Sequence, residues 1–254
     1  MIEFDHVSYV VGDRRIVDGL TLTVASGEFC ALVGSSGSGK STTLKMINRL
    51  LPASAGAIRL DGTDIAGVNP EQLRRSIGYV IQSIGLFPHW TVADNIATVP
   101  RLLRWPEEKT RVRVAELLEL LRLETAEATK YPHQLSGGQQ QRVGVARALA
   151  ADPNILLMDE PFGALDPITR TALQAELASL HRRLGKTILF VTHDIDEALR
   201  LADRVAIIDA GKLVQVGKPE EILSNPATDF VRDFVGDPEL RRLALKIARR
   251  DAKG

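Results

Sequence analysis

The feature that most restricts the fold is a glycine-rich segment between a strand-like run and a helix-like run. Residues 34–41 read Gly-Ser-Ser-Gly-Ser-Gly-Lys-Ser, which matches the pattern G-x-x-x-x-G-K-[ST]. The apolar, β-rich run 29–33 precedes it, and helical spacing begins near Lys40. Glycines let backbone N–H groups converge on phosphate oxygens, and a helix start adds the positive end of its dipole. The segment therefore predicts a phosphate-binding loop in an α/β protein.

This loop predicts a bound nucleotide and a magnesium ion. Lys40 is expected to reach the β- and γ-phosphates, and the hydroxyl of Ser41 is expected to ligate Mg²⁺. The other loop residues that we expect to contact the nucleotide are Gly34, Ser35, Ser36, Gly37, Ser38, Gly39 and Thr42. The loop alone does not choose among ATPases, GTPases, kinases and helicases, although the guanine-reading motif Asn-Lys-x-Asp is absent from the sequence.

Composition places the chain among globular proteins and gives no sign of a nucleic-acid partner. The 254 residues are enough for one large α/β domain or for a core with a smaller inserted lobe. Lys plus Arg and Asp plus Glu are both 32, whereas a nucleic-acid-binding protein usually has a basic excess. We therefore expect no nucleic-acid partner.

The sequence predicts a protein that stays in the cytoplasm and reaches a membrane only through a partner. No run approaches 18 apolar residues, and the N-terminus does not resemble a signal peptide. Cys30 is the one cysteine, so no disulfide forms within the chain, which fits a reducing compartment. Its strand-like surroundings predict a small core residue.

Short apolar runs alternate with helical stretches, which is typical of a mostly parallel sheet covered by helices. The expected strands are 2–7, 17–24, 29–33, 57–60, 77–81, 154–158, 187–192, 204–209 and, at an edge, 213–216. Residues 83–152 change character, with helical spacing over 92–103 and 107–121. We expect a nucleotide-binding core over 1–82 and 153–224, a helical lobe over 83–152 and a helical tail over 225–254.

A second chemical feature is a pair of neighbouring carboxylates. The apolar strand expected before them ends in Asp159, and Glu160 follows directly. An acid at a strand end near a phosphate loop can hold Mg²⁺, usually through water, while a second acid polarises the attacking water. A solvated acidic turn, to which Pro161 also fits, is the alternative. The upstream phosphate loop favours Asp159 as a metal ligand and Glu160 as the catalytic base.

The motif that indicates a family is Leu-Ser-Gly-Gly-Gln at 135–139, just before a helix expected over 140–150. Alone, it would fit a simple helix cap and turn. The phosphate loop, Gln82, the carboxylate pair and His193 also occur in the order found in the ATP-binding subunit of ABC transporters. The chain resembles this subunit over about residues 2–235. The resemblance implies a RecA-like P-loop NTPase core with an inserted α-helical lobe and a small antiparallel β part.

The resemblance also implies a homodimer with ATP between its two copies. Ser136, Gly137, Gly138 and Gln139 of one copy would close on the γ-phosphate that the other copy holds. These residues precede a helix, where backbone N–H groups bind anions. Asp166 lies in a segment that resembles the loop crossing the dimer interface.

Three further residues take roles by resemblance. Gln82 would touch Mg²⁺ and the attacking water, and His193 would contact the γ-phosphate and Glu160. Family members commonly place an aromatic residue near Val11 to stack on adenine. Here the nearest aromatic is Tyr9, which shares a strand face with Val11 because the two are two residues apart. Stacking on adenine and simple packing both remain open for Tyr9.

Residues 77–91 and 95–105 closely resemble importers of glycine betaine, choline and related osmoprotectants. This resemblance implies membrane permease subunits, an extracytoplasmic solute-binding protein and a position on the inner face of the membrane. Phe87, Pro88 and Trp90 would form a docking patch for the permease, or would pack inside the lobe. The alternatives are a motor for another small solute, a non-transport ABC ATPase, and a module that holds ATP without turnover.

The end of the printed sequence predicts a basic tail. Residues 241–254 contain six basic residues and one acid, which fits a solvated helix or contact with anionic lipid. Many osmoprotectant ATPases carry paired regulatory domains after the motor, and we expect none within these 254 residues.

Overall fold

The structure is a computed structural model that describes residues 1–237 and Arg241. The predicted basic tail therefore lies outside the described residues, Arg241 excepted. The chain divides into two compact units, one formed by 1–68 and 181–254 and the other by 69–180. Among the described residues, no helix combines the length and apolar character needed to cross a membrane.

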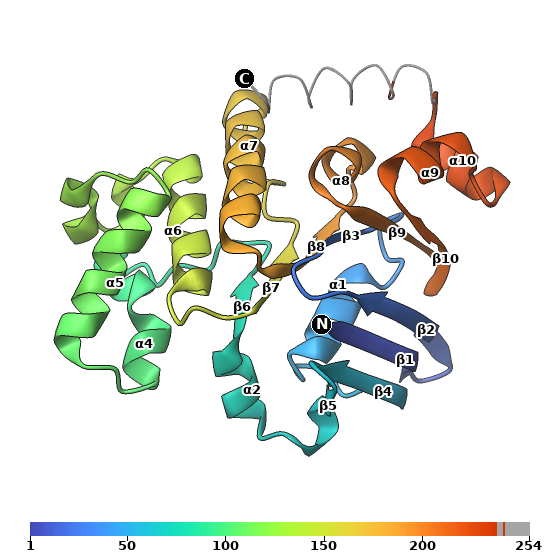
Figure 1. The fold of residues 1–254 in the computed structure, drawn as a ribbon, viewed down its shortest axis with the longest axis horizontal. Helices are drawn as coiled ribbons and strands as arrows, with labels where there is room; N and C mark the ends of the chain where they lie inside the picture. The colour runs from blue at the N-terminus through green and yellow to red at the C-terminus, as the bar shows by residue number, and fades with distance from the viewer. Residues whose placement is uncertain (238–240, 242–254) are drawn as a thin grey trace. The chain divides into compact units, whose positions relative to one another are not determined.

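The first unit contains a small antiparallel sheet with the strand order β2-β1-β4-β5 (Figure 1). Its strands are β1 (Ile2–Val11), β2 (Arg14–Val24), β4 (Ala55–Leu60) and β5 (Thr63–Asp64). Apolar and exposed residues alternate in β2, as expected for a sheet with one buried face. The antiparallel part that the family resemblance implied is therefore present.

A parallel arrangement surrounds the central strand of the first unit. These strands are β3 (Phe29–Val33), β8 (Thr187–Thr192), β9 (Arg204–Asp209) and β10 (Lys212–Gly217). β3 pairs in parallel with β8 and β9, and β10 pairs antiparallel with β9. Every residue of β3 and β8 is buried, which explains why both read as continuous apolar runs.

The described residues of the first unit also form several short helices. They are α1 (Lys40–Ile47), η1 (Ile65–Gly67), α8 (Ile195–Leu201), α9 (Pro219–Ser224) and α10 (Asp229–Val235). The side chain of Asp194 accepts the N–H groups of Asp196 and Glu197 and so caps α8. The helix α10 lies within the tail that was expected to be helical.

The second unit combines two parallel strands with a set of helices. β6 (Ile77–Val80) pairs in parallel with β7 (Ile155–Asp159). The helices are α2 (Pro70–Ser76), α3 (Val92–Ile96), α4 (Thr98–Leu102), α5 (Glu107–Leu120), η2 (Thr125–Thr129), η3 (Pro132–Gln134), α6 (Gly137–Leu149) and α7 (Pro167–Leu184). α6 contacts α3, α5 and β6, so it is the central helix of this unit.

The helical spacing over 92–103 is confirmed, although the segment forms two short helices that meet at Ala97. The hydroxyl of Thr98 donates to the carbonyl of Asn95 at 2.7 Å and so competes with the helical ladder. Pro100 also lacks the N–H that a continuous helix would use. The unpredicted helix α2 begins where the side chain of Asn69 accepts the N–H groups of Glu71 and Gln72.

Candidate functional site

The phosphate-loop residues of the first unit connect β3 to α1, as the sequence predicts. Gly34 has φ 155°, and a Cβ added there would lie 2.0 Å from the carbonyl oxygen of Ile208. Gly39 has φ 100°, and its Cβ would lie 2.6 Å from the carbonyl oxygen of Ile16. The backbone of β9 lies against Gly34 and the backbone of β2 lies against Gly39, so only glycine fits at both positions.

Lys40 is buried under this loop, with only 5% of the residue exposed. Its ammonium group donates to the carbonyl oxygens of Gly34 at 2.9 Å and Ser35 at 2.8 Å. It also donates to the hydroxyl of Ser38 at 3.3 Å. A buried cation facing a loop with exposed Ser35, Ser36 and Gly37 is suited to hold phosphate.

His193 lies at the same sheet edge as the phosphate loop. Val33 and Thr192 are register partners in the parallel pair of β3 and β8. Gly34 and His193 follow them, so both leave the sheet at neighbouring carboxyl ends, where α/β proteins bind ligands. His193 is exposed. Thr192 fixes the turn that follows, because its hydroxyl donates to Glu197 at 2.7 Å and accepts the N–H of Asp194 at 3.0 Å.

Tyr9 lies on the strand face that points toward the phosphate loop. It is the register partner of Val17 in the antiparallel pair of β1 and β2, so the two side chains share a face. A Cβ added to Gly39 would lie 3.1 Å from Cγ2 of Val17. Tyr9 is half-buried, whereas Val11 is 55% exposed.

In the second unit, the predicted carboxylate pair and Gln82 meet at one sheet edge. Asp159 ends β7 and is 4% exposed, and Glu160 follows with φ 43°. Gln82 follows the neighbouring parallel strand β6, and its amide Nε2 donates to Oε2 of Glu160 at 3.2 Å. Burial raises the pKa of the half-buried Tyr79 to about 12, and the negative charge of Asp159 is the second, smaller cause.

The Ser-Gly-Gly-Gln motif forms the N-terminal cap of α6. The hydroxyl of Ser136 accepts the N–H of Gln139 at 3.3 Å, and the side-chain oxygen of Gln139 accepts the N–H of Ser136 at 2.8 Å. Gly138 is buried, and a Cβ there would lie 2.6 Å from Cγ2 of Thr169. Gly137 is exposed, with nothing nearer than 3.7 Å to its Cβ position. The hydrogen bonds between Ser136 and Gln139 therefore fix the start of α6, and Gly137 stays exposed to solvent.

Sequence reasoning missed the side chain that holds this motif from behind. Glu127 is 3% exposed, and its carboxylate accepts a hydrogen bond from the side-chain amide of Gln139. The same carboxylate accepts the N–H of Glu124 at 3.0 Å and lies 3.5 Å from the ammonium of Lys130. No periodicity marks this residue, because it lies in the short helix η2.

We expect Glu127→Leu to lower the free energy of unfolding by about 1–3 kcal/mol, because the side-chain amide of Gln139 and the N–H of Glu124 lose their buried acceptor. A lower urea midpoint with an unchanged slope would report the loss. Glu119→Leu, which replaces an exposed glutamate of α5, should change the free energy by less than about 0.5 kcal/mol. Equal losses in the two variants would contradict the expectation.

Asp166 has a local structural role as well as its predicted place in a dimer loop. Its carboxylate accepts the N–H groups of Ile168 at 3.1 Å and Thr169 at 3.0 Å near the start of α7. Hydrogen bonds from the side chain and backbone of Thr169 hold the pKa of Asp166 below its usual value. Asp166 is exposed, so both roles are compatible with the structure of this unit.

A sequence comparison decides the family. Residues 17–163, more than half of the chain, match the model of the family described as ABC transporter. The chain belongs to the ABC transporter family. The match spans the phosphate loop, Gln82, the Ser-Gly-Gly-Gln motif and the carboxylate pair. This ABC protein is an ATPase of the transporter type, so the predicted α/β fold, the family and the binding of ATP are confirmed.

Individual relatives agree with this assignment. The ABC chain is 59% identical over 248 residues to the glycine betaine uptake system ATP-binding protein YehX of Escherichia coli K12, which covers 97% of this chain and 80% of the relative. It is 56% identical to the glycine betaine/carnitine/choline transport ATP-binding protein OpuCA of Bacillus subtilis 168, over 94% of this chain and 63% of the relative.

A solved structure shares the fold at 35% identity and a TM-score of 0.76, covering 86% of this chain and 99% of the other. It is the dimeric post-hydrolysis state of the ATP-binding cassette MJ0796, bound to ADP and phosphate.

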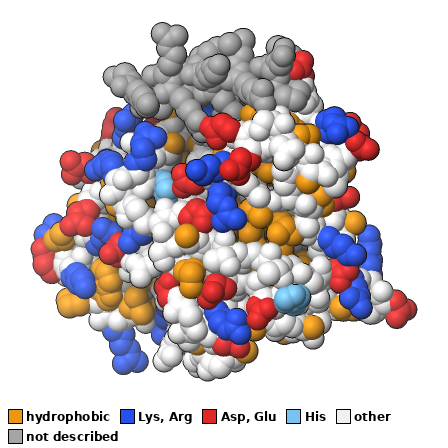
Figure 2. Space-filling model, turned by 45° about the vertical axis from the view of Figure 1, so that its right-hand side comes forward, with side chains coloured by type: hydrophobic (Ala, Val, Ile, Leu, Met, Phe, Trp, Pro, Cys, Tyr) orange, Lys and Arg blue, Asp and Glu red, His pale blue; other side chains and the backbone are white. Residues whose placement is uncertain are grey.

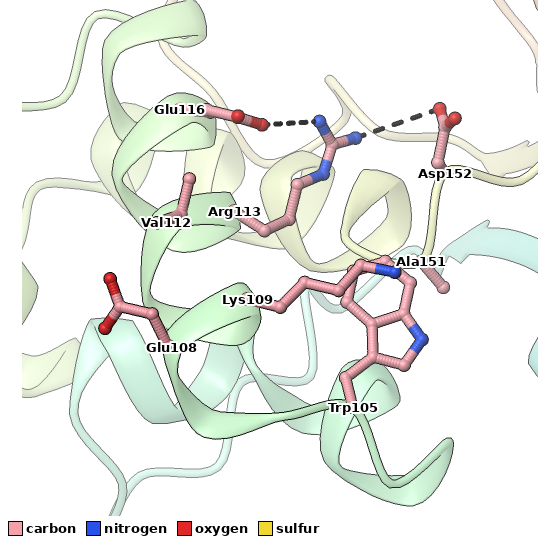
Figure 3. A pocket seen from close by; sticks show the side chains of 8 residues that line it. All are labelled: Trp105, Glu108, Lys109, Val112, Arg113, Glu116, Ala151 and Asp152. Atoms are coloured by element: carbon pink, nitrogen blue, oxygen red, sulfur yellow. Dashed lines mark hydrogen bonds and ion pairs between the residues drawn. The ribbon is translucent and has the colours of Figure 1, made fainter.

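The second unit of this ABC ATPase also has an open hollow that contains none of the predicted site residues (Figure 3). Its volume is about 720 Å³. It is lined by Trp105, Glu108, Lys109, Val112, Arg113, Glu116, Ala151 and Asp152. The ammonium of Lys109 lies 3.8 Å from the ring centre of Trp105. Arg113 pairs with Glu116 at 3.1 Å and lies 3.8 Å from Asp152, so the charges of this hollow are largely matched internally.

Proposed function

We propose that this chain powers the import of glycine betaine, choline or a related quaternary ammonium osmoprotectant by hydrolysing ATP. The observation that carries the proposal is the 59% identity to the glycine betaine uptake ATP-binding protein, over 97% of this chain. The choline- and carnitine-transport relative adds the same solute class. The chain spans 63% of the length of that second relative.

The nucleotide site proposed for this motor is built from the phosphate loop, Gln82, the carboxylate pair and His193. Lys40 binds the β- and γ-phosphates with the backbone of the residues around it, from Gly34 to Thr42. His193 contacts the γ-phosphate. Glu160 accepts a proton from the attacking water, and Gln82 orients that water. Tyr9 supports the adenine ring. The family match over 17–163 supports the roles of the loop residues, Gln82 and Glu160, and the local geometry of the first unit supports those of His193 and Tyr9.

Magnesium fits the donor set proposed for this site. Mg²⁺ is usually held by one or two carboxylates, substrate phosphates and water. Asp159, Ser41 and Gln82 supply a carboxylate, a hydroxyl and an amide oxygen, which are the oxygen donors that this ion prefers. Within the described residues, no cluster of three His, Cys, Asp or Glu side chains offers a different metal site. When bound, the ion would neutralise charge that develops on the phosphates.

Dimerisation completes the proposed site. Ser136, Gly137, Gly138 and Gln139 of one copy cap the ATP held by a second copy, and Asp166 lies in the segment that crosses between copies. The exposed outer surface of Gly137 supports this role, as does the dimeric state of the similar cassette bound to ADP and phosphate. Backbone N–H groups at the start of α6 offer the hydrogen bonds that an anion needs.

The proposed partners are membrane permease subunits on the inner face of the cell membrane and an extracytoplasmic solute-binding protein. Phe87 is 39% exposed, Pro88 is exposed, and Trp90 packs against Phe87 with ring centres 4.5 Å apart. Buried Asn95 holds this segment through hydrogen bonds to Phe87, Trp90 and Thr91. An ordered, partly exposed aromatic surface suits permease docking. On the face drawn in Figure 2, charges of both signs are interspersed, which favours a protein partner over nucleic acid.

Deletion of the gene in a strain without redundant uptake systems should abolish uptake of labelled glycine betaine or choline. A plasmid copy should restore uptake, and a copy carrying Glu160→Gln should not. Unchanged uptake of both solutes would refute the cargo assignment, and loss of a different solute would point to another importer.

A further inference from the structure

A turn directly after Gln82 has a backbone that its own sequence does not favour. Ile84 has φ 59° and Gly85 has φ 55°, so both lie in the left-handed region. A β-branched residue such as Ile84 rarely adopts this conformation, which costs about 1–3 kcal/mol. The turn closes locally through the N–H of Ile84, which donates to Ile81 at 3.1 Å, and the N–H of Gly85, which donates to Ser83 at 2.6 Å. A strained turn of this kind persists only where its surroundings hold it.

Arg147 on α6 holds the strained turn in place. One end of its guanidinium donates to the carbonyl oxygen of Gly85 at 2.6 Å, and the other end donates to the carbonyl oxygen of Ile84 at 2.7 Å. Both acceptors belong to the strained residues, and the planar fork of arginine matches two neighbouring carbonyls. Burial lowers the pKa of Arg147, because its guanidinium is largely removed from water.

Gly144 lets the turn approach the same face of α6. It lies three residues before Arg147, so the two positions are neighbours on the helix surface. A Cβ added to Gly144 would lie 3.3 Å from Cγ2 of Ile84, which is tighter than an ordinary contact. The side chain of Ile84 therefore packs against α6 at Gly144, and the backbone of the turn is hydrogen-bonded to Arg147 on the same face.

From this geometry we propose that Arg147 is a positioning residue for ATP hydrolysis, which clamps the turn so that Gln82 stays against Glu160. The inference rests on the proposed roles of Gln82 and Glu160. Gln82 is held at one side by the end of β6 and at the other by the clamped turn, and its amide lies 3.2 Å from Glu160. The clamp also joins this turn to α6, the helix that begins directly after Ser136. One helix thus connects the residue that orients water with the motif that caps ATP.

The test compares Arg147→Met with Arg113→Met, a matched control on the neighbouring helix α5, which contacts α6. Arg113 also donates to two backbone carbonyls, those of Leu149 at 3.0 Å and Ala150 at 3.3 Å, and its ion pairs are drawn in Figure 3. It has no contact with the turn after Gln82 in any hydrogen bond recorded for the described residues. Both variants should lower the melting temperature, so stability alone does not separate them.

In the complex with its permease, Arg147→Met should lower kcat for ATP at least about tenfold, while the Kd for ATP changes less than about twofold. Hydrogen exchange of the purified full chain should speed up at residues 82–86. Arg147→Lys keeps the charge but loses the fork, and should give an intermediate kcat. Arg113→Met should keep wild-type kcat and wild-type exchange at 82–86.

Equal kcat values for Arg147→Met and Arg113→Met, with a wild-type complex that hydrolyses ATP, would overturn this inference and leave the proposed function intact. Unchanged exchange at residues 82–86 would overturn it as well. A wild-type complex without hydrolysis would reject the proposed function and the positioning role together. If Arg147→Met does not fold, the same comparison between Arg147→Lys and the control decides.

Discussion

Glu160→Gln is expected to bind ATP with near wild-type affinity and to hydrolyse it at least about 100-fold more slowly. General-base assistance contributes roughly 10²–10⁴-fold to a rate, and an amide does not accept the proton of the attacking water. The substitution preserves size and leaves a side-chain oxygen to accept the hydrogen bond from Gln82 at 3.2 Å. Because hydrolysis would normally release the dimer, the variant should accumulate as an ATP-bound dimer. Single-turnover phosphate release and gel filtration with ATP measure the two effects.

A suitable control for this variant is Glu108→Gln. The side chain of Glu108 is 71% exposed and pairs with Arg111 on the surface of α5. This change should leave both turnover and dimerisation unaltered. Rapid hydrolysis by Glu160→Gln would remove Glu160 from the catalytic role, and a purely monomeric profile with ATP would count against the capped dimer.

Lys40→Ala is expected to abolish tight ATP binding. Lys40 is 5% exposed and faces the phosphate loop, so its charge acts in a water-poor setting. Removing one partner of a buried, hydrogen-bonded charge pair costs about 2–5 kcal/mol, which corresponds to about 30-fold or more in Kd. Isothermal titration of the purified chain with ATP measures this change directly.

Lys45→Ala is the matched control, because Lys45 lies on the same helix and is exposed. It should retain wild-type affinity. Far-UV circular dichroism of both variants would show that the helix α1 is intact. An unaltered Kd in Lys40→Ala, with a folded protein, would contradict the assignment of the phosphate loop as the nucleotide site.

Local chemistry explains why much of the fold was predictable. β3 and β8 are buried throughout, so their sequences had to be continuous apolar runs, and both were predicted at their observed bounds. The phosphate loop was recognisable because backbone crowding at Gly34 and Gly39 excludes every other residue type. The helical spacing over 92–103 predicted helix but not its division at Ala97, where the hydroxyl of Thr98 and the missing N–H of Pro100 interrupt the helical hydrogen bonds.

The supporting residues of the site could not be predicted in the same way. Glu127 and Arg147 belong to no motif, and their partners are 12 and 62–63 residues away in the sequence. Their side chains act on Gln139 and on the turn at Ile84 only after helices have packed. A single sequence carries no signal for a contact that depends on two separate elements arriving at one place.

The family, the phosphate loop and the order of the chemical motifs can be read from the amino-acid sequence, because they rest on short segments whose residues act on their immediate neighbours. The contact of Gln82 with Glu160, the support that Glu127 gives to the Ser-Gly-Gly-Gln motif and the restraint of a strained turn by Arg147 exist only in the folded chain. Those contacts join separate strands and helices, so their existence depends on packing, which brings together side chains that are distant along the chain.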